Sequence, residues 1–214
     1  MCSIIGSFSK EMIKSLVLLN QHRGNFSYSI AAYDIHQHEV VDLKKDFDVF
    51  DFNVLDSMTE SSNIYYICHL QAPTGGLLKE IERIHPTHID DTYMWHNGII
   101  TPAGMRFLNE LNSREDSFDT YALHNYLYNN NDLSKVEGLF TCCYVDFNVY
   151  VFRTKHGKLY VDDNLNLSSE RFEGSKCINY DTIYNLDFIN KTLQYADEFK
   201  TLNYNYIIKG ELDA

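Results

Sequence analysis

The chain has 214 residues, 44% of them hydrophobic and 22% charged, and its formal net charge is −12. These values predict one globular domain over residues 2–214 and exclude a disordered chain. The negative charge disfavours nucleic acid and anionic membranes as partners, because both repel it. The sequence contains no apolar run near the ~18 residues that span a bilayer and no recognisable signal peptide, so we expect a cytoplasmic protein.

The cysteines and histidines show no clear ligand pattern. Five cysteines are scattered along the chain without a Cys-x-x-Cys pair, which argues against a disulfide framework and against structural zinc. His36 and His38, like His85 and His88, have a spacing found more often at ordinary turns and strands than in a metal site. We therefore expect neither a metal ion nor another cofactor.

Apolar patterning in the first half predicts a strand, a helix and then several strands. The first strand is expected at 2–6, and the helix at 10–21, after a candidate cap at Ser9. Further strands are expected at 26–33, 39–43, 64–69 and 92–95. The segment 46–56, in which Asp alternates with Phe and Val, favours a half-exposed edge strand.

The second half reads as two helices followed by strands. The helices are expected at 105–111 and 119–128, and a β-hairpin at 140–146 and 149–154. Short segments at 159–161 and 165–168 extend the hairpin's sheet in this interpretation, and the tail adds strands at 182–186 and 204–208. This order favours an α+β fold with mostly antiparallel sheets over alternating βαβ units.

Cys2 is the first candidate for a chemical role. If Met1 is removed, Cys2 becomes the N-terminal residue, and its α-amine, with a pKa of about 8, can act as general base for its own thiol. Thiol attack on an amide also needs donors for the oxyanion, and Asn97-Gly98 offers a side-chain amide and an unhindered N–H. Each feature alone is more often structural, as a buried strand cysteine or a hairpin turn.

Several short segments occur in a specific order along the chain. They are Cys2-Ser3-Ile4-Ile5-Gly6, Gln21-His22-Arg23-Gly24, residues 69–76, His85-Pro86, His96-Asn97-Gly98-Ile99-Ile100, Phe118-Asp119-Thr120, residues 138–146 and Ser168-Ser169-Glu170. In this order they resemble the motifs of the class II glutamine amidotransferases, which are N-terminal-nucleophile (Ntn) enzymes, over residues 2–170. The resemblance implies a four-layer αββα sandwich with two mostly antiparallel sheets.

The resemblance also implies catalytic roles. Cys2 is the nucleophile and, through its amine, the base, while Arg23 supports the nucleophile region. Asn97 and Gly98 form the oxyanion hole. Phe26 stands where the family has an aspartate, which suggests a repacked loop around Arg23.

Substrate recognition is where the sequence departs most from the family. The resemblance implies that Thr74 and Gly75 line the glutamine pocket and that Asp119 holds the substrate α-ammonium. Gln71 stands where the family has an arginine that clamps the α-carboxylate. A neutral amide binds a carboxylate more weakly than a guanidinium fork does.

Three functions stay open on this evidence. The first is a glutaminase-type domain that forms a thioester at Cys2 and passes ammonia to a separate synthetase protein. The second is an amidase of the same fold acting on another small amide, such as a γ-glutamyl compound, which Gln71 favours. The third is a catalytically silent binding protein, and the intact Cys2, Arg23, Asn97, Gly98 and Asp119 argue against it.

Overall fold

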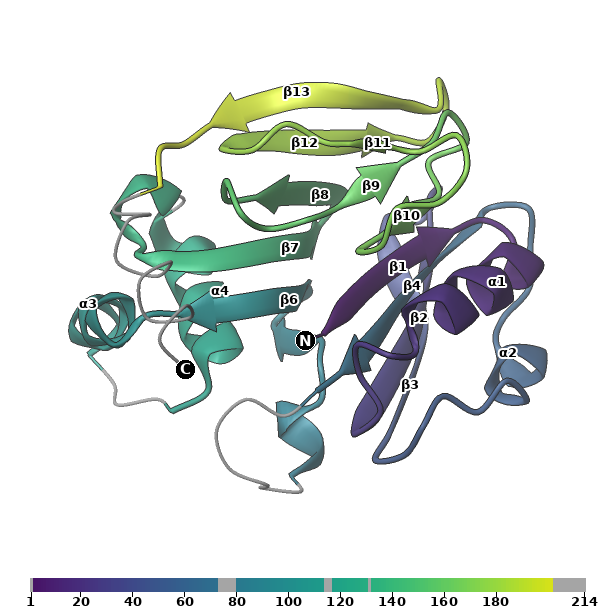
Figure 1. Cartoon of the computed structure of the whole chain (residues 1–214), viewed down its shortest axis with the longest axis horizontal. Helices are drawn as coiled ribbons and strands as arrows, with labels where there is room; N and C mark the ends of the chain where they lie inside the picture. The colour runs from purple at the N-terminus through teal and green to yellow at the C-terminus, as the bar shows by residue number, and fades with distance from the viewer. Residues whose placement is uncertain (1, 73–79, 114–116, 131, 202–214) are drawn as a thin grey trace.

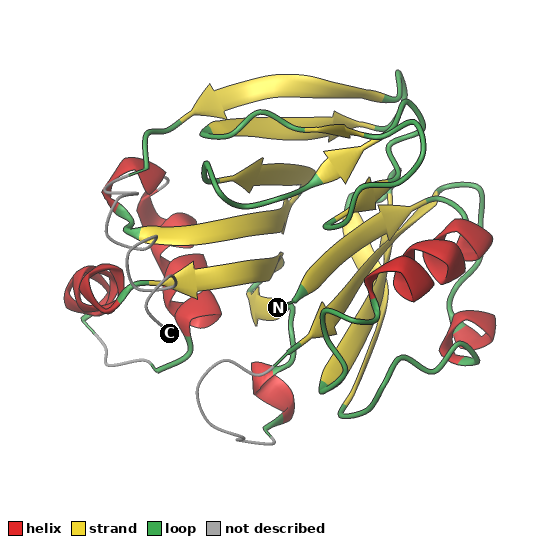
Figure 2. Ribbon diagram, in the orientation of Figure 1, coloured by secondary structure: helices red, strands yellow, loops and turns green. Residues whose placement is uncertain are grey.

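The computed structural model describes residues 2–72, 80–113, 117–130 and 132–201. Two antiparallel sheets face each other, and helices cover their outer faces, as Figures 1 and 2 show. The layers are helix, sheet, sheet and helix. This is the α+β sandwich that the motifs predict.

The first sheet has seven strands among the described residues, in the order β11-β9-β10-β1-β4-β2-β3. Their bounds are β1 (Ser3–Ser7), β2 (Ser27–Asp34), β3 (Glu39–Asp46), β4 (Ile64–Gln71), β9 (Tyr160–Val161), β10 (Leu167–Ser168) and β11 (Lys176–Cys177). Strand β1 lies in the middle of the sheet, where Ile5 pairs with Cys68 of β4 on one side and with Ser168 of β10 on the other. The predicted strands at 2–6, 26–33, 39–43 and 64–69 are confirmed.

The second sheet has six strands in the part of the chain that is described, in the order β13-β12-β8-β7-β6-β5. Their bounds are β5 (Thr87–Ile89), β6 (Thr92–Ile100), β7 (Gly138–Asp146), β8 (Asn148–Arg153), β12 (Thr182–Asp187) and β13 (Thr192–Glu198). Strand β6 is longer than predicted, since it continues through Asn97-Gly98 and pairs with β7 as far as Ile100. Asn97-Gly98 is therefore inside a strand and is not a hairpin turn.

The described helices are α1 (Lys10–Asn20), α2 (Val54–Ser57), α3 (Pro102–Asn112) and α4 (Asp119–Asn130), with short 3-10 turns η1 (Ile81–Arg83) and η2 (Leu133–Lys135). Helices α1, α3 and α4 lie close to their predicted positions, whereas the short helix α2 was not predicted. Ser9 caps α1 as predicted, because its hydroxyl accepts a hydrogen bond from the Met12 N–H. Thr101 caps α3 in the same way through the Gly104 N–H.

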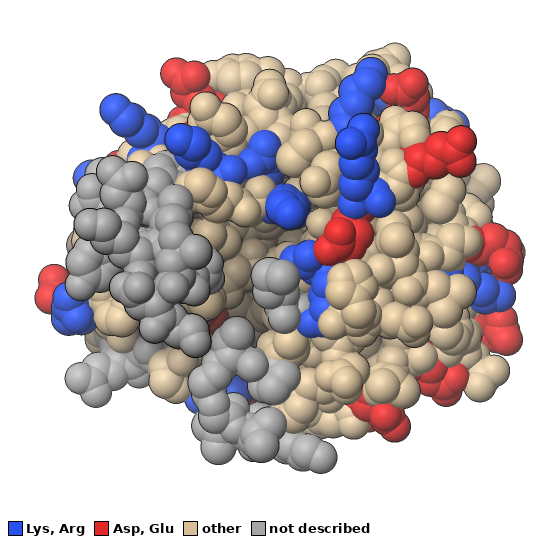
Figure 3. Space-filling view, in the orientation of Figure 1, with Lys and Arg blue, Asp and Glu red and all other residues tan. Residues whose placement is uncertain are grey.

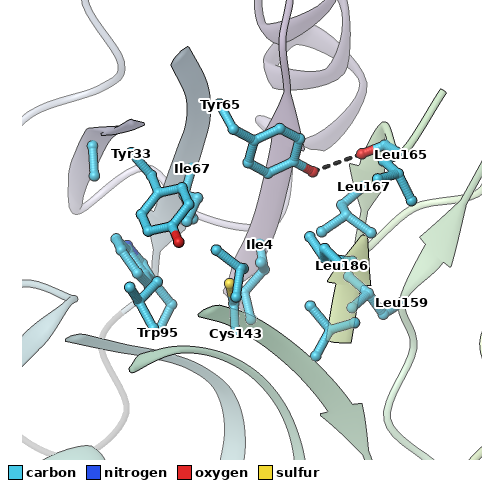
Figure 4. Packing of buried hydrophobic residues seen from close by; sticks show 14 of the residues in the cluster. Ile4, Tyr33, Tyr65, Ile67, Trp95, Cys143, Leu159, Leu165, Leu167 and Leu186 are labelled. Atoms are coloured by element: carbon cyan, nitrogen blue, oxygen red, sulfur yellow. Dashed lines mark hydrogen bonds between the residues drawn. The ribbon is translucent and has the colours of Figure 1, made fainter. Parts of the chain in front are cut away.

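Three apolar clusters separate the four layers. The cluster between the sheets includes Ile4, Trp95 and Cys143, and Figure 4 shows these side chains meeting there. The cluster under α1 includes Ile5, Ile13 and Cys68, and that under α3 and α4 includes Leu108, Leu123, Phe140 and Cys142. Neighbours along β1 and along β7 thus face opposite layers, as the period of a strand requires.

Two predictions about strand placement are wrong. Strands β9 and β10 do not extend the hairpin's sheet. They belong to the first sheet, where β10 pairs with β1 and β9 pairs with β10, and the Ser169 N–H donates to the Ile4 carbonyl. The segment 46–56 is not an edge strand beyond Asp46. There, Asp48 and Asp51 accept hydrogen bonds from nearby backbone N–H groups, and this competes with strand pairing.

The structure describes the tail as far as residue 201. Strand β12 confirms the strand predicted at 182–186, and β13 was not predicted. The short strand β5, earlier in the chain, was not predicted either. The strand predicted at 204–208 lies outside the described residues.

Candidate active site

Cys2 lies at the N-terminal end of β1, against the C-terminal end of β4. Its side chain is buried, with 8% of its surface exposed. The thiol Sγ is 3.4 Å from the Ala72 N and 3.5 Å from the Ala72 carbonyl oxygen. Figure 3 shows that the surface is hollowed near the middle of this face, close to the N-terminal end of the chain marked in Figure 1.

The surroundings of Cys2 keep its sulfur protonated at rest. Burial raises the pKa of the Cys2 thiol, and Asp119 adds to this, although the Ala72 N–H and the positive charge of Arg23 act in the opposite direction. A thiol with a raised pKa needs a base before it can attack.

Arg23 holds the backbone at the nucleophile. Its Nε donates to the Cys2 carbonyl oxygen at 3.1 Å, and its Nη1 pairs with the Glu170 carboxylate. Gly24 follows and packs directly on β4, because a Cβ there would lie 2.7 Å from the Leu70 carbonyl oxygen. The contact with the Cys2 backbone is the kind of support that the sequence predicts for Arg23, whose catalytic role stays a prediction.

Asn97 reaches from the second sheet to the first through Ser169. Its Nδ2 donates to the Ser169 Oγ at 3.3 Å, and the same oxygen accepts the Ile4 N–H at 2.9 Å. The Asn97 side chain is therefore held two residues along β1 from Cys2. Nδ2 carries two hydrogens, and a second donor direction is what an oxyanion site needs.

Gly98 allows β6 to approach β7 closely beside Asn97. Its φ of 149° is rarely adopted by other residues, and a Cβ at this position would lie 2.0 Å from the Leu139 carbonyl oxygen. A side chain at position 98 would therefore push the two strands apart and move Asn97.

Asp119 begins α4 near the same end of β6. The Thr120 N–H donates to Asp119 Oδ1 at 2.8 Å, and the Ile100 N is 3.5 Å from Oδ2. The side chain is 23% exposed, so its carboxylate is fixed by the chain but reachable from solvent. That combination suits the binding of a cationic group.

Gln71 is engaged with its own chain. Its Nε2 donates to the Arg83 carbonyl oxygen at 2.9 Å, and its Oε1 lies 3.2 Å from the Ser27 hydroxyl and 3.3 Å from the His85 N. These contacts fix the amide between β2, β4 and η1. Its predicted contact with substrate remains a prediction. Thr74 and Gly75, predicted to line the pocket, lie outside the described residues.

Some groups at this site were not assigned a role from the sequence. The Ala72 backbone contacts the thiol, and Ser169 joins Asn97 to β1. Ser169 belongs to the motif Ser168-Ser169-Glu170, which is the sequence feature that could have indicated its role. No rule of spacing indicates a backbone contact such as that of Ala72.

Buried histidines surround this region. His69 belongs to β4, His96 to β6 and His85 to the segment between η1 and β5, and His124 lies further along α4. Burial lowers the pKa of His69 to about 3 and that of His124 to about 4. It also lowers the pKa of His85 and His96, so all four imidazoles are neutral near pH 7.

Within the described ranges, no group of three or more His, Cys, Asp or Glu residues is placed to hold a metal ion. Over the same residues, none of the helices is both long enough and apolar enough to cross a bilayer.

Comparison with solved structures identifies the fold. A glutamine phosphoribosylpyrophosphate amidotransferase from B. subtilis, complexed with ADP and GMP, matches with a TM-score of 0.62 and 15% identity over 92% of this chain and 49% of that one. A structure described as the allosteric regulatory enzyme of purine biosynthesis matches with a TM-score of 0.64 and 16% identity over 96% of this chain and 50% of that one. The chain thus has the fold of the class II, Ntn-type amidotransferases and spans about half the length of these proteins.

Searches with the whole sequence return no match. No protein-family model matches the chain, and no curated protein matches it.

The buried histidines predict a loss of stability in mild acid. Their folded pKa values lie below the unfolded value of about 6.5, so unfolding takes up protons below that pH. The stabilising contribution is complete above pH ~6.5 and is lost as the pH falls through the folded pKa of each group; for His69, with a folded pKa of about 3, and His124, with a folded pKa of about 4, the loss is about 1.4 kcal/mol per pH unit. Denaturant unfolding at pH 7.5, 6 and 5 measures this slope.

His124→Gln should reduce the slope of the unfolding free energy against pH by the contribution of one buried histidine. The wild type, unfolded in parallel at each pH, is the reference. A free energy of unfolding that stays constant from pH 7 to 5 would contradict the assignment of neutral buried imidazoles.

Proposed function

We propose that this chain is a glutamine amidohydrolase whose nucleophile is Cys2. The observation that carries the proposal is that one oxygen, the Ser169 Oγ, joins the Asn97 amide to the backbone of β1 two residues from the thiol. A nucleophile and an oxyanion donor are thereby tied to the same strand. Asp119 supplies a carboxylate for the α-ammonium of the substrate.

The proposed reaction requires that Met1 has already been removed, which frees the α-amine of Cys2. The α-amine of Cys2 takes the thiol proton, which the raised pKa of the buried thiol makes necessary. Sγ attacks the side-chain amide carbon of glutamine, and Asn97 with the Gly98 N–H stabilises the oxyanion. The amine then protonates the leaving nitrogen, and the C–N bond breaks to give ammonia and a thioester.

Water completes the turnover. It attacks the thioester with the amine as base, the C–S bond breaks, and glutamate leaves with the free thiol restored. We propose that the ammonia passes to a separate synthetase protein.

A glutamine-like diazoketone should label Cys2. The diazoketone places an electrophilic carbon where the amide carbon of glutamine would lie, and we expect one label at Cys2 in the protein whose Met1 has been removed, detected by peptide mass spectrometry. Cys68, Cys142 and Cys143 are fully buried, so they serve as internal controls. Cys2→Ala should fold normally and lose glutamine turnover. A wild-type protein that leaves Cys2 unlabelled and glutamine intact would support the silent binding protein.

Asn97→Ala should lower kcat by roughly 10²- to 10³-fold, the usual effect of losing one oxyanion donor. KM should change far less, because the donor is used mainly in the transition state. Steady-state kinetics and the melting temperature are measured together. A large loss of stability with nearly normal turnover in the folded fraction would assign Asn97 a structural role only.

One observation favours a second candidate, an amidase acting on an amide other than free glutamine. The Gln71 amide, at the position of the family arginine, bonds to the chain through both of its polar atoms. A substrate without an α-carboxylate would need no cation there.

A pair of truncated substrates tests this point. 4-Aminobutanamide lacks the α-carboxylate of glutamine, and we expect kcat/KM to fall by less than about 10-fold, since no charge-assisted pair is lost. Glutaramate lacks the α-ammonium, and its kcat/KM should fall by about 10- to 100-fold through loss of the Asp119 contact. A 100-fold loss with 4-aminobutanamide would show that another cation holds the carboxylate. An analogue better than glutamine would favour the second candidate.

A further inference from the structure

Four buried side chains form a hydrogen-bonded cluster that the proposed reaction does not use. They are His69 of β4, His85 after η1, His96 of β6 and Thr120 of α4, each no more than 4% exposed. His85 Nδ1 is 3.0 Å from His69 Nε2, and His85 Nε2 is 2.7 Å from Thr120 Oγ1. His96 Nδ1 is 3.0 Å from the same Thr120 oxygen. We call these four residues the histidine–threonine cluster.

The hydrogen bonds of the cluster have a fixed direction. The His96 carbonyl oxygen can only accept, so His69 Nε2, 3.2 Å away, carries the proton. His69 Nε2 has one proton, so its N–H is shared between the His96 carbonyl oxygen and His85 Nδ1; the proton of His85 then lies on Nε2, which donates to Thr120. This follows because each imidazole is neutral and has one donor and one acceptor.

The proton of His96 is placed by what surrounds its other nitrogen. Among the described residues, His96 Nε2 is buried without a hydrogen-bond partner. A buried N–H without a partner costs more than a buried lone pair, so the proton belongs on Nδ1, which donates to Thr120 Oγ1. His69 Nδ1, also without a partner in this part of the chain, is likewise left as a bare acceptor.

Thr120 is therefore where the cluster converges. Its oxygen accepts from His85 and from His96, which uses both lone pairs, and its single hydroxyl proton is left for Asp119 Oδ1 at 3.5 Å. A hydroxyl that accepts two hydrogen bonds is polarised and donates more strongly. Such contacts are often long without substrate and shorten when it binds.

Three of the four members of the cluster also adjoin a residue of the candidate site. His96 precedes Asn97, Thr120 follows Asp119, and the His85 backbone N lies 3.3 Å from Gln71 Oε1. The cluster thus joins β4, β6 and α4 directly behind the groups that face the substrate.

We propose that Thr120, held by His85 and His96, is a positioning residue that sets the Asp119 carboxylate for the α-ammonium of the substrate. This inference rests on the proposed glutaminase function. It assigns a specificity role to a buried hydroxyl that does not itself touch substrate.

The chain contains a matched control for this role. His124 forms a second buried imidazole–hydroxyl pair, with Thr87 Oγ1 2.8 Å from its Nδ1 and Thr92 Oγ1 2.8 Å from its Nε2. Thr87 is 3% exposed and is not adjacent in sequence to a candidate site residue. Thr87→Val and Thr120→Val therefore remove the same kind of contact, and only the second lies behind Asp119.

The experiment compares glutamine and glutaramate as substrates for the wild type, Thr120→Val, Thr120→Ser and Thr87→Val. Thr120→Val should lower kcat/KM for glutamine by roughly 10- to 100-fold, the effect of a misplaced binding group. Activity on glutaramate, which lacks the α-ammonium, should change little. Thr120→Ser keeps the hydroxyl and should therefore restore the preference for glutamine over glutaramate. Thr87→Val should leave this preference as it is in the wild type.

Thermal unfolding of the same variants separates positioning from packing. Thr120→Val and Thr87→Val should lower the melting temperature by similar amounts. Equal losses on glutamine and glutaramate in Thr120→Val, or the same selectivity in both valine variants, would overturn the proposal. A wild type that hydrolyses neither substrate and does not react with the diazoketone would instead overturn the proposed function, and the positioning role with it.

Discussion

The backbone of Ile4 is held on both edges of β1. On one side it pairs with β4, and on the other its N–H and carbonyl groups bond to the side chain and the backbone N–H of Ser169. Because strand β1 is buried on both faces as well, the residue at its N-terminal end has little freedom. The thiol of Cys2, the Arg23 contact and the Asn97 contact all depend on this one short strand. A nucleophile at a chain terminus would otherwise be the least ordered part of a protein.

The sequence predicted most of this fold because its elements have strong local patterns. The capping residue Ser9 predicts the start of α1, and the alternation of apolar and polar residues along 140–154 predicts the β7–β8 hairpin. Both predictions use only residues that are close together in the sequence. The wrong predictions concern choices that local pattern does not settle. Strands β9 and β10 are too short to show which sheet they join, and only the bonds from Ser169 to Ile4 decide it. Within 46–56, aspartates that bond their own backbone outweighed the alternation.

The sequence suggests candidate site residues where one side chain suffices for a proposed chemical task. Cys2, Asn97 and Asp119 are candidates because of their functional groups and their order in the chain, and their roles stay predictions. The contacts of Gln71 and the convergence on Thr120 were not predicted, because each depends on three segments that meet only after folding. The tautomers of His69 and His85 follow from the position of a single carbonyl oxygen, which the sequence does not indicate.

Strand β13 forms the outer edge of the second sheet, and in the described chain it pairs with β12 alone. Most of its residues are exposed, so its free backbone groups form a template on which another extended chain could add a strand. Two features oppose such self-association. Asp197 and Glu198 place negative charge at the end of this edge, and the pairing with β12 shifts register between Ile183 and Tyr184, which twists the hairpin. The acidic character of the protein thus acts locally, as protection against aggregation through an open sheet edge.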